Sequence, residues 1–254
     1  MQVVDFCHYP GWPAPGGREI PVNGREQCPY LAGREASFRN VWAEWMGAEE
    51  YGKWMNAGFR RAGRVVYQPV CVGCRECVPI RVTVAEFAAS KSQRRAWRRN
   101  RDLRVEWRGI EDVRKGEREE RYQLYRRYYG GWHGGEACEF EQFEWLYYES
   151  CVETVEFTYR TAAGELVALG WCDVGREYVS SVYFLFDPAE AGRSLGTFGA
   201  LVEIEFARQI GAPYYYLGYW VRHCQEMTYK ASYRPHEFLG LDGVWRRAAA
   251  SPER

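Results

Sequence analysis

Three β-rich segments lie one after another in the second half of the 254-residue chain, and they constrain its fold more than any other feature. The predicted strands are 154–160, 165–173 and 178–186. The first two are separated only by a short segment containing Ala-Ala-Gly, which suits a hairpin connection. The sequence therefore predicts consecutive antiparallel strands in this region.

A helix and a fourth strand follow directly. Asp187-Pro188 ends the third strand, and Ser194 is a good N-cap for a helix of about seventeen residues. The apolar positions of this helix recur at helical spacing, namely Leu195, Phe198, Leu201, Val202 and Phe206. Gly211 stands where a helix-ending glycine belongs, and Pro213 opens a strand at 214–220. Antiparallel strands, a helix and a returning strand predict an α+β fold with a mainly antiparallel sheet.

The first half of the chain carries shorter elements. Residues 1–27 are rich in proline and contain paired glycines, so we expect an irregular N-terminal arm. The elements expected after the arm are a helix at 48–57 ended by Gly58, a strand at 78–84, a helical basic run after that strand, and helices at 118–129 and 139–148. The change to β-rich runs places a boundary near residue 110. It separates an N-terminal domain at 28–110, rich in cysteine and arginine, from a C-terminal domain at 111–254.

The net charge is zero, but the charges are unevenly distributed. Eight basic residues against two acidic ones lie in 91–108, whereas 136–156 holds seven glutamates and no Lys or Arg. Opposed blocks of this kind can still give one face that attracts phosphate. The chain shows no apolar run of 18 residues and no signal-peptide pattern at Met1, so we expect a cytoplasmic protein without a membrane segment.

Cysteines at two-residue gaps form a candidate metal site. Cys71, Cys74 and Cys77 together with Cys28 could supply four thiolates to a structural Zn ion or to an iron–sulfur cluster. Nine cysteines in a chain too large to need disulfides favour reduced thiols. The alternative is that these thiols are reduced and buried, packed beneath the neighbouring arginines.

Arginines on both sides of these cysteines form a candidate carboxylate site. Arg60, Arg61 and Arg81 place dense positive charge near glycines that allow close backbone approach. A guanidinium group grips a carboxylate with two parallel hydrogen bonds, which suits selection of an acidic ligand. The alternative is internal pairing with Glu44, Glu49 or Glu50.

The basic run that follows suits nucleic acid. Its first part contains Lys91, Arg94, Arg95, Arg98 and Arg99. Aromatic rings interleave with the charges, at Trp97 and Trp107. Such a combination fits backbone phosphates and stacked bases. The alternative is an ordinary solvated helix face.

Many short motifs also occur in one order along the chain. Those of the first half are Cys28-Pro29-Tyr30-Leu31, 58–63, Tyr67-x-Pro69-x-Cys71, Cys74, Cys77, Pro79-x-Arg81 and Ser92-Gln93-Arg94-Arg95. Those of the second half are Phe186-Asp187-Pro188, Ser194-Leu195-Gly196-Thr197, Tyr216-Leu217-Gly218-Tyr219-Trp220, Cys224-x-x-Met227-x-Tyr229-Lys230 and Pro235. In this order they resemble the aminoacyl-tRNA–protein transferases, in particular the short bacterial branch that transfers leucine to N-terminal Asp or Glu. The resemblance spans roughly 28–245.

The resemblance implies a GNAT-like acyltransferase fold for the C-terminal domain. It also implies a reaction in which the free α-amine of an acceptor protein attacks the ester carbonyl of an aminoacyl-tRNA. Because the ester is already activated, this chemistry requires no cofactor and no covalent nucleophile. The implied partners are aminoacyl-tRNA and proteins with acidic N-termini, and the product would carry an N-terminal leucine that marks it for degradation.

The same resemblance implies roles for individual residues. The candidates for catalytic, orienting groups are Asp187, Tyr219 and Lys230. The pocket for the charged 3′ end of the tRNA is expected at the free N–H groups of a helix start, lined by Tyr183, Ser194, Leu195 and Gly196. The arginines at 60, 61 and 81 would then bind the acidic N-terminal residue of the acceptor, and the basic run from Lys91 to Arg99 would bind tRNA.

Three other functions remain open at this point. Arginine could be the donor amino acid, as in longer relatives, with the acidic block 136–156 as its partner. A CoA-dependent N-acetyltransferase is the second, although Phe198 occupies a position where pyrophosphate binding favours a small residue. The third is a non-enzymatic, metal-bound RNA module.

Overall fold

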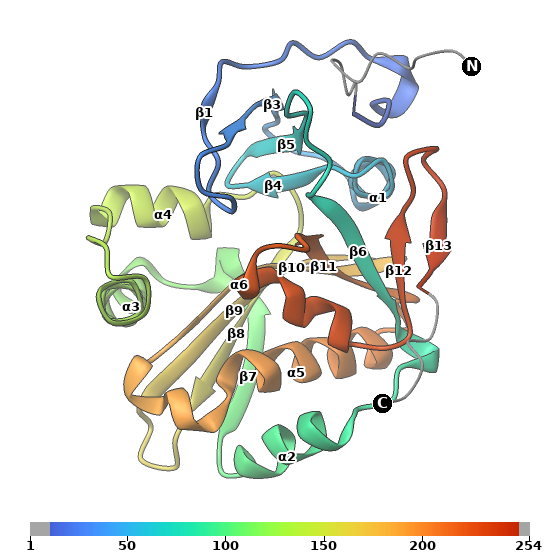
Figure 1. Cartoon of the computed structure of the whole chain (residues 1–254). Helices are drawn as coiled ribbons and strands as arrows, with labels where there is room; N and C mark the ends of the chain where they lie inside the picture. The colour runs from blue at the N-terminus through green and yellow to red at the C-terminus, as the bar shows by residue number, and fades with distance from the viewer. Residues whose placement is uncertain (1–10, 249–254) are drawn as a thin grey trace.

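A computed structural model describes residues 11–248, and its centre is one large sheet (Figure 1). The order of its eight strands is β13 (Trp245–Arg247), β12 (His236–Leu239), β6 (Val78–Thr83), β11 (Tyr214–Trp220), β10 (Tyr178–Phe186), β9 (Leu166–Gly175), β8 (Thr154–Arg160) and β7 (Arg104–Gly109). All neighbouring strands are antiparallel except β10 and β11, which pair in parallel. The α+β class and the mainly antiparallel sheet are confirmed.

The expected order of strands, helix and returning strand is also confirmed. Strands β8, β9 and β10 pair in sequence, α5 (Leu195–Gln209) crosses over, and β11 returns beside β10. This arrangement needs a crossover helix because parallel neighbours cannot be joined by a hairpin. Gly211 has the positive φ of 76° that ends a helix in the left-handed conformation.

Helix α5 packs closely on one face of the sheet. Its residues Leu195, Phe198 and Ile204 join a core with Phe157 and Val179 of the strands. A Cβ on Gly199 of α5 would lie 2.0 Å from the Phe184 ring of β10, so only glycine permits this approach. Burying this stripe of α5 contributes about 25 cal/mol for each Å² of apolar surface removed from water.

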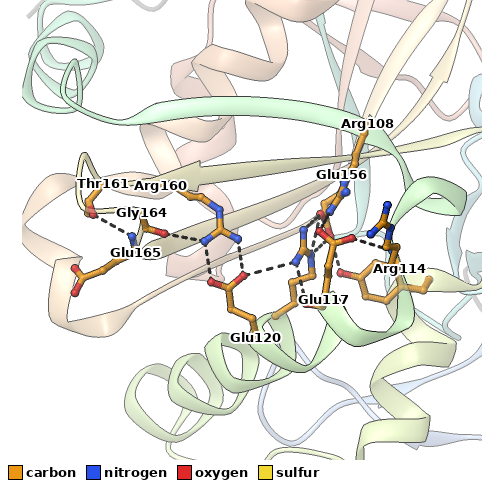
Figure 2. A network of polar contacts seen from close by, with 11 residues as sticks. Arg108, Arg114, Glu117, Glu120, Glu156, Arg160, Thr161, Gly164 and Glu165 are labelled. Carbon is orange, nitrogen blue, oxygen red and sulfur yellow. Dashed lines mark hydrogen bonds and ion pairs between the residues drawn. The ribbon is translucent and has the colours of Figure 1, made fainter.

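The opposite face is covered by α3 (Lys115–Tyr128) and α4 (Phe140–Tyr148). Alternate residues of β9 serve the two faces: Cys172 packs in the α5 core, whereas Trp171 packs in the α3–α4 core. Figure 2 shows Glu120 of α3 facing Arg160 of β8. Beside that pair, the buried Glu156 accepts three hydrogen bonds from Arg121. Charged contacts thus fix how α3 docks on the sheet.

A smaller sheet lies over one end of the large one (Figure 1). Its strands, in order, are β3 (Phe38–Trp42), β5 (Val65–Pro69) and β4 (Arg60–Ala62), with α1 (Ala48–Asn56) beside them and the two-residue strands β1 (Glu26–Gln27) and β2 (Glu35–Ala36) nearby. Gly58 follows α1 with φ of 82°, and a Cβ there would lie 2.7 Å from the Trp12 ring. The described part of the N-terminal arm is therefore anchored, since Trp12 is buried. Residues 1–10 of that arm, with Cys7, lie outside the described residues.

The large sheet draws strands from both parts of the chain. Strands β6 and β7 precede residue 110, yet β6 pairs with β11 and β12, and β7 pairs with β8. The boundary expected near 110 thus falls between two neighbouring strands of one sheet. Helix α2 (Lys91–Arg99) lies between β6 and β7 in sequence, and Ser90 caps it in a capping box with Gln93. No helix within 11–248 is long and apolar enough to cross a membrane.

Candidate active site

The parallel strands β10 and β11 separate soon after they begin to pair. Their pairing covers only Tyr178–Ser180 against Tyr214–Tyr216. Both strands are irregular just beyond this point, with register shifts between Ser181 and Tyr183 and between Tyr216 and Tyr219. Such irregularities end pairing and redirect side chains. A cavity of about 510 Å³ opens where the strands diverge. We call it the donor cavity, after the donor pocket that the sequence resemblance predicts.

The donor cavity contains the whole expected pocket. Tyr183, Ser194, Leu195 and Gly196 all line it. Further walls come from Tyr128 and Trp132, from other residues of β10 and α5, and from the segment around α6 (Gln225–Thr228). The sequence patterns assign Tyr128 and Trp132 no role in a site.

The start of α5 differs from the expectation in one respect. Ser194 occupies the N-cap position, but it has a left-handed backbone with φ of 60° and makes no side-chain cap. Its Oγ instead accepts a hydrogen bond from Arg99 at 3.3 Å. The first turn of α5 therefore presents its backbone N–H groups and the positive end of its dipole beside the cavity.

Lys230 is the one expected catalytic candidate whose side chain lines the donor cavity. Its Nζ donates to the carbonyl oxygen of Tyr219 at 2.9 Å. Burial, and secondly the positive charge of Arg60, lower the pKa of Lys230 to about 8. An ammonium group keeps further N–H donors after one hydrogen bond, so Lys230 can also donate to a ligand.

The two other catalytic candidates are engaged elsewhere. The Tyr219 hydroxyl donates to the carbonyl of Gly58 at 2.7 Å and thereby ties β11 to the loop after α1. Asp187 accepts from Arg127 at 2.7 Å and from the backbone N–H of Ala189 at 3.0 Å. Neither residue is among those that line the cavity, and these contacts hold both side chains beside it.

Arg61 and Arg81 are paired inside the protein. Arg61 binds both carboxylate oxygens of Asp173, and both side chains are buried. Arg81 donates to Glu237 at 2.7 Å and to Asn56 at 3.0 Å. Internal pairing was the alternative expected from the sequence, but it involves none of the glutamates named there. The guanidinium groups of these two arginines are thus already used.

Arg60 differs from both. Only 5% of it is exposed, yet within 11–248 it forms no ion pair with a carboxylate. Its guanidinium donates to carbonyl oxygens of Met55, Phe59 and Gly218, and its Nε has no partner among the described residues. It also lies over the ring of Tyr219, 5.6 Å from the centroid. A buried cation without a counter-charge is costly, and an anionic ligand would offset this cost.

The basic residues of α2 form an exposed face beside the donor cavity. Lys91, Arg94, Arg95, Arg98 and Arg99 are all exposed. Between α2 and α5 lies a groove of about 320 Å³, and the residues lining it include Arg94, Trp97, Arg98, Arg101 and Arg208. Arg99 also contacts the carbonyl of Gly192 and the hydroxyl of Ser194 at the cavity. Arg99 therefore links the positive face of α2 to Ser194 at the edge of the cavity.

The expected metal ligands are not arranged as a ligand set. Within 11–248, no group of three or more Cys, His, Asp or Glu side chains could hold a metal ion. Cys74 Sγ accepts a hydrogen bond from Arg34, and Cys71 Sγ contacts the backbone of Ser37. Burial, and then the neighbouring thiols, raise the pKa of Cys77 to about 12.

Sequence reasoning missed Glu203, a buried carboxylate that lines the donor cavity. It lies on α5, and its Oε2 accepts a hydrogen bond from the hydroxyl of Tyr215 at 2.5 Å. One signal was available: Glu203 interrupts the apolar side of the helix, among Gly199, Ala200 and Ala207. A charged residue at such a position points to a polar task in the interior.

Two family models match this chain. The model of the C terminus of arginine-tRNA-protein transferases matches residues 120–240, and the model of their N terminus matches residues 26–95. Among solved structures, that of L-PGS from Bacillus licheniformis has a TM-score of 0.45 at 12% identity, covering 72% of this chain and 52% of the other. A tandem GNAT protein from the clavulanic acid biosynthesis pathway has a TM-score of 0.40 at 10% identity, covering 77% and 58%.

Closer similarity is found among curated bacterial proteins. An aspartate/glutamate leucyltransferase from Thiobacillus denitrificans is 36% identical over 233 residues, covering 90% of this chain and 94% of the relative. Proteins of the same name from Hahella chejuensis and Acinetobacter baylyi are 36% and 41% identical, covering 85% and 75% of this chain and 91% and 69% of the relatives. The chain is therefore an aminoacyltransferase that belongs to the arginine-tRNA-protein transferase family, within its group of aspartate/glutamate leucyltransferases.

Proposed function

We propose that this protein transfers leucine from leucyl-tRNA to the α-amine of proteins that begin with Asp or Glu. The observation that carries the acceptor half of this proposal is the buried Arg60, which has no carboxylate partner within 11–248. The names of the relatives support both the donor and the acceptors. Such a reaction takes place where tRNA is charged, which is the cytoplasm.

The donor side is the cavity between β10 and β11 together with α2. The exposed basic face of α2 would hold phosphates near the 3′ end of the tRNA, and Trp97 offers a ring on which a base can stack. Arg99 reaches from α2 to Ser194 at the cavity, so the aminoacyl ester would enter beside the start of α5.

The acceptor side is the region of Arg60 and Lys230. The guanidinium of Arg60 would pair with the side-chain carboxylate of the acceptor's first residue. Because this guanidinium is desolvated, the pair would be stronger than one in water. Lys230 lies between the two sides, since it lines the cavity and feels the charge of Arg60.

The chemistry then needs positioning and charge stabilisation. The neutral α-amine, whose pKa is about 8, attacks the ester carbonyl. A C–N bond forms, the C–O bond to the ribose breaks, and an amine proton ends on the ribose oxygen. Lys230 would donate a hydrogen bond to the oxyanion that develops on the carbonyl, a contribution of the kind that often dominates acyl transfer.

A transfer assay tests the proposal directly. The purified protein is mixed with Leu-tRNA or Arg-tRNA and with peptides that begin with Asp, Glu or Ala. The masses of the peptide products are then measured by mass spectrometry. Addition of leucine to the Asp and Glu peptides, with little addition to the Ala peptide, is the expected result. Addition of arginine in place of leucine, or equal addition to all three peptides, would contradict it.

A further inference from the structure

Glu203 is a carboxylate that the proposed transfer leaves without a task. It lies in the middle of α5 and is 1% exposed. Its neighbours come from three strands. The hydroxyl of Tyr215 on β11 donates a hydrogen bond to Oε2 at 2.5 Å. Gly170 of β9 leaves space beside Oε1, since a Cβ at this position would lie 2.8 Å from that oxygen. Ser181 of β10 lies close to it. The carboxylate therefore sits at the point where β10 and β11 diverge.

One oxygen of this carboxylate is unused. Ser181 and Cys172 are close enough to lower its pKa, but no donor among the described residues makes a hydrogen bond of good geometry with Oε1. Burial outweighs these contacts and raises the pKa of Glu203 to about 7. Interior carboxylates normally have all their acceptors filled, so an open one inside a ligand cavity indicates a missing donor.

The substrate that would enter this cavity carries such a donor. A leucyl ester combines an apolar side chain with a free α-ammonium group on the carbon next to the reacting carbonyl. The cavity walls also offer apolar and aromatic side chains, including Phe184, Ala200 and Leu217. The apolar part of the substrate thus fits the walls, whereas the α-ammonium requires an anion.

We propose that Glu203 binds the α-ammonium group of the donor aminoacyl ester and makes the enzyme select donors whose α-amine is free. This inference rests on the proposed function, because it places the aminoacyl ester in the donor cavity. N-blocked esters such as acetyl-leucyl-tRNA would be rejected, since they leave the buried carboxylate unpaired and add bulk beside it. The enzyme would thereby distinguish leucyl-tRNA from peptidyl-tRNA and from formylated aminoacyl-tRNA.

Binding without any acceptor peptide tests the inference separately from transfer. The affinity of the whole protein is measured by filter binding for tRNA carrying leucine, acetyl-leucine or the α-hydroxy analogue of leucine, in which OH replaces the amine. We expect the wild type to bind leucyl-tRNA at least about 10-fold more tightly than the hydroxy analogue. In Glu203→Gln, which keeps the acceptor for Tyr215, this preference should disappear while affinity for the hydroxy analogue is retained.

Two outcomes would overturn the inference. One is a wild type that binds the leucyl and α-hydroxy tRNAs equally, a result that does not depend on how any variant folds. The other is a folded Glu203→Gln variant that keeps the full preference. Tyr215→Phe serves as the matched control, because it removes a hydrogen bond but not the charge, and it should keep the preference. Failure of transfer to acidic peptides, with the α-amine preference intact, would count against the proposed acceptor alone.

Discussion

Arg61 and Asp173 form a buried ion pair that joins β4 of the small sheet to β9 of the large sheet. Nε of Arg61 lies 2.8 and 2.9 Å from the two carboxylate oxygens, and Thr154 donates to the same carboxylate at 2.9 Å. The preceding residue, Arg60, has no carboxylate partner within 11–248. Two adjacent arginines of one strand therefore differ: Arg61 joins the two sheets through Asp173, whereas Arg60 is buried and donates to backbone carbonyl oxygens.

This difference predicts the stability of Arg61 variants. Arg61→Ala leaves Asp173 buried and unpaired, so the free energy of unfolding should fall by about 3–5 kcal/mol. In the double variant Arg61→Met with Asp173→Leu, no charge is left unpaired, and a large part of the loss should be recovered. Urea unfolding measures both. A loss below about 1 kcal/mol in Arg61→Ala would show that the pair does not hold the sheets together.

Glu203 should make stability depend on pH. In the folded protein the pKa of Glu203 is about 7, so its carboxyl group keeps its proton up to about that pH. In the unfolded chain the same group has the ordinary pKa of 4.5 and loses its proton there. Between these values the folded state binds more protons, so this group's contribution to the free energy of unfolding falls as pH rises. The free energy of unfolding of Glu203→Gln, taken relative to that of wild type, should therefore increase by up to about 3 kcal/mol from pH 5 to pH 8. Unfolding curves of both proteins at pH 5 and pH 8 check this. A difference between variant and wild type that is equal at the two pH values would contradict it.

Lys230 should determine the alkaline side of the pH–rate profile. As pH rises, the acceptor amine becomes neutral and the rate increases, while Lys230 loses its charge around pH 8 and the rate falls. We expect a bell-shaped profile of kcat/KM with a maximum near this pH. In Lys230→Arg the falling limb should disappear, because a guanidinium stays protonated. A falling limb that persists in Lys230→Arg would assign it to another group.

The basic face of α2 should give tRNA binding its salt dependence. The variant changes Arg94, Arg95, Arg98 and Arg99 to Gln. Its affinity for tRNA should fall, and the slope of log K against log salt should flatten by up to about 0.7–0.9 for each phosphate that the variant no longer neutralises. A control with the same change in charge replaces the exposed Arg25, Arg126, Arg246 and Arg247 with Gln. If both variants show the same slope, α2 is not the tRNA-binding face.

The fold was largely predictable because local patterns determine it. The apolar spacing from Leu195 to Phe206 and the glycine at 211 place α5 within two residues of its observed bounds. The left-handed backbone of Ser194 was not predictable, since a good N-cap residue normally caps with its side chain. The sequence also did not indicate that β6 and β7 belong to the large sheet, because strand pairing between distant segments leaves no local signal.

The site was predictable in its region but not in its individual residues. The motifs located Lys230, Tyr183 and the start of α5, which the structure brings together in one cavity. They could not separate Arg60 from Arg61, because the partner of Arg61 lies 112 positions away. They also did not indicate that the Tyr219 hydroxyl donates to Gly58, a hydrogen bond that forms only when the two sheets have packed.

The preference for an acidic acceptor tests the central claim most directly. Transfer of leucine is measured as kcat/KM for two peptides that differ only in beginning with Asp or with the neutral, isosteric Asn. The wild type should prefer the Asp peptide by about 30-fold or more, and Arg60→Gln should reduce this preference to near one. A folded Arg61→Met/Asp173→Leu variant should keep it. Equal rates with both peptides in the wild type, or an undiminished preference in Arg60→Gln, would contradict the account.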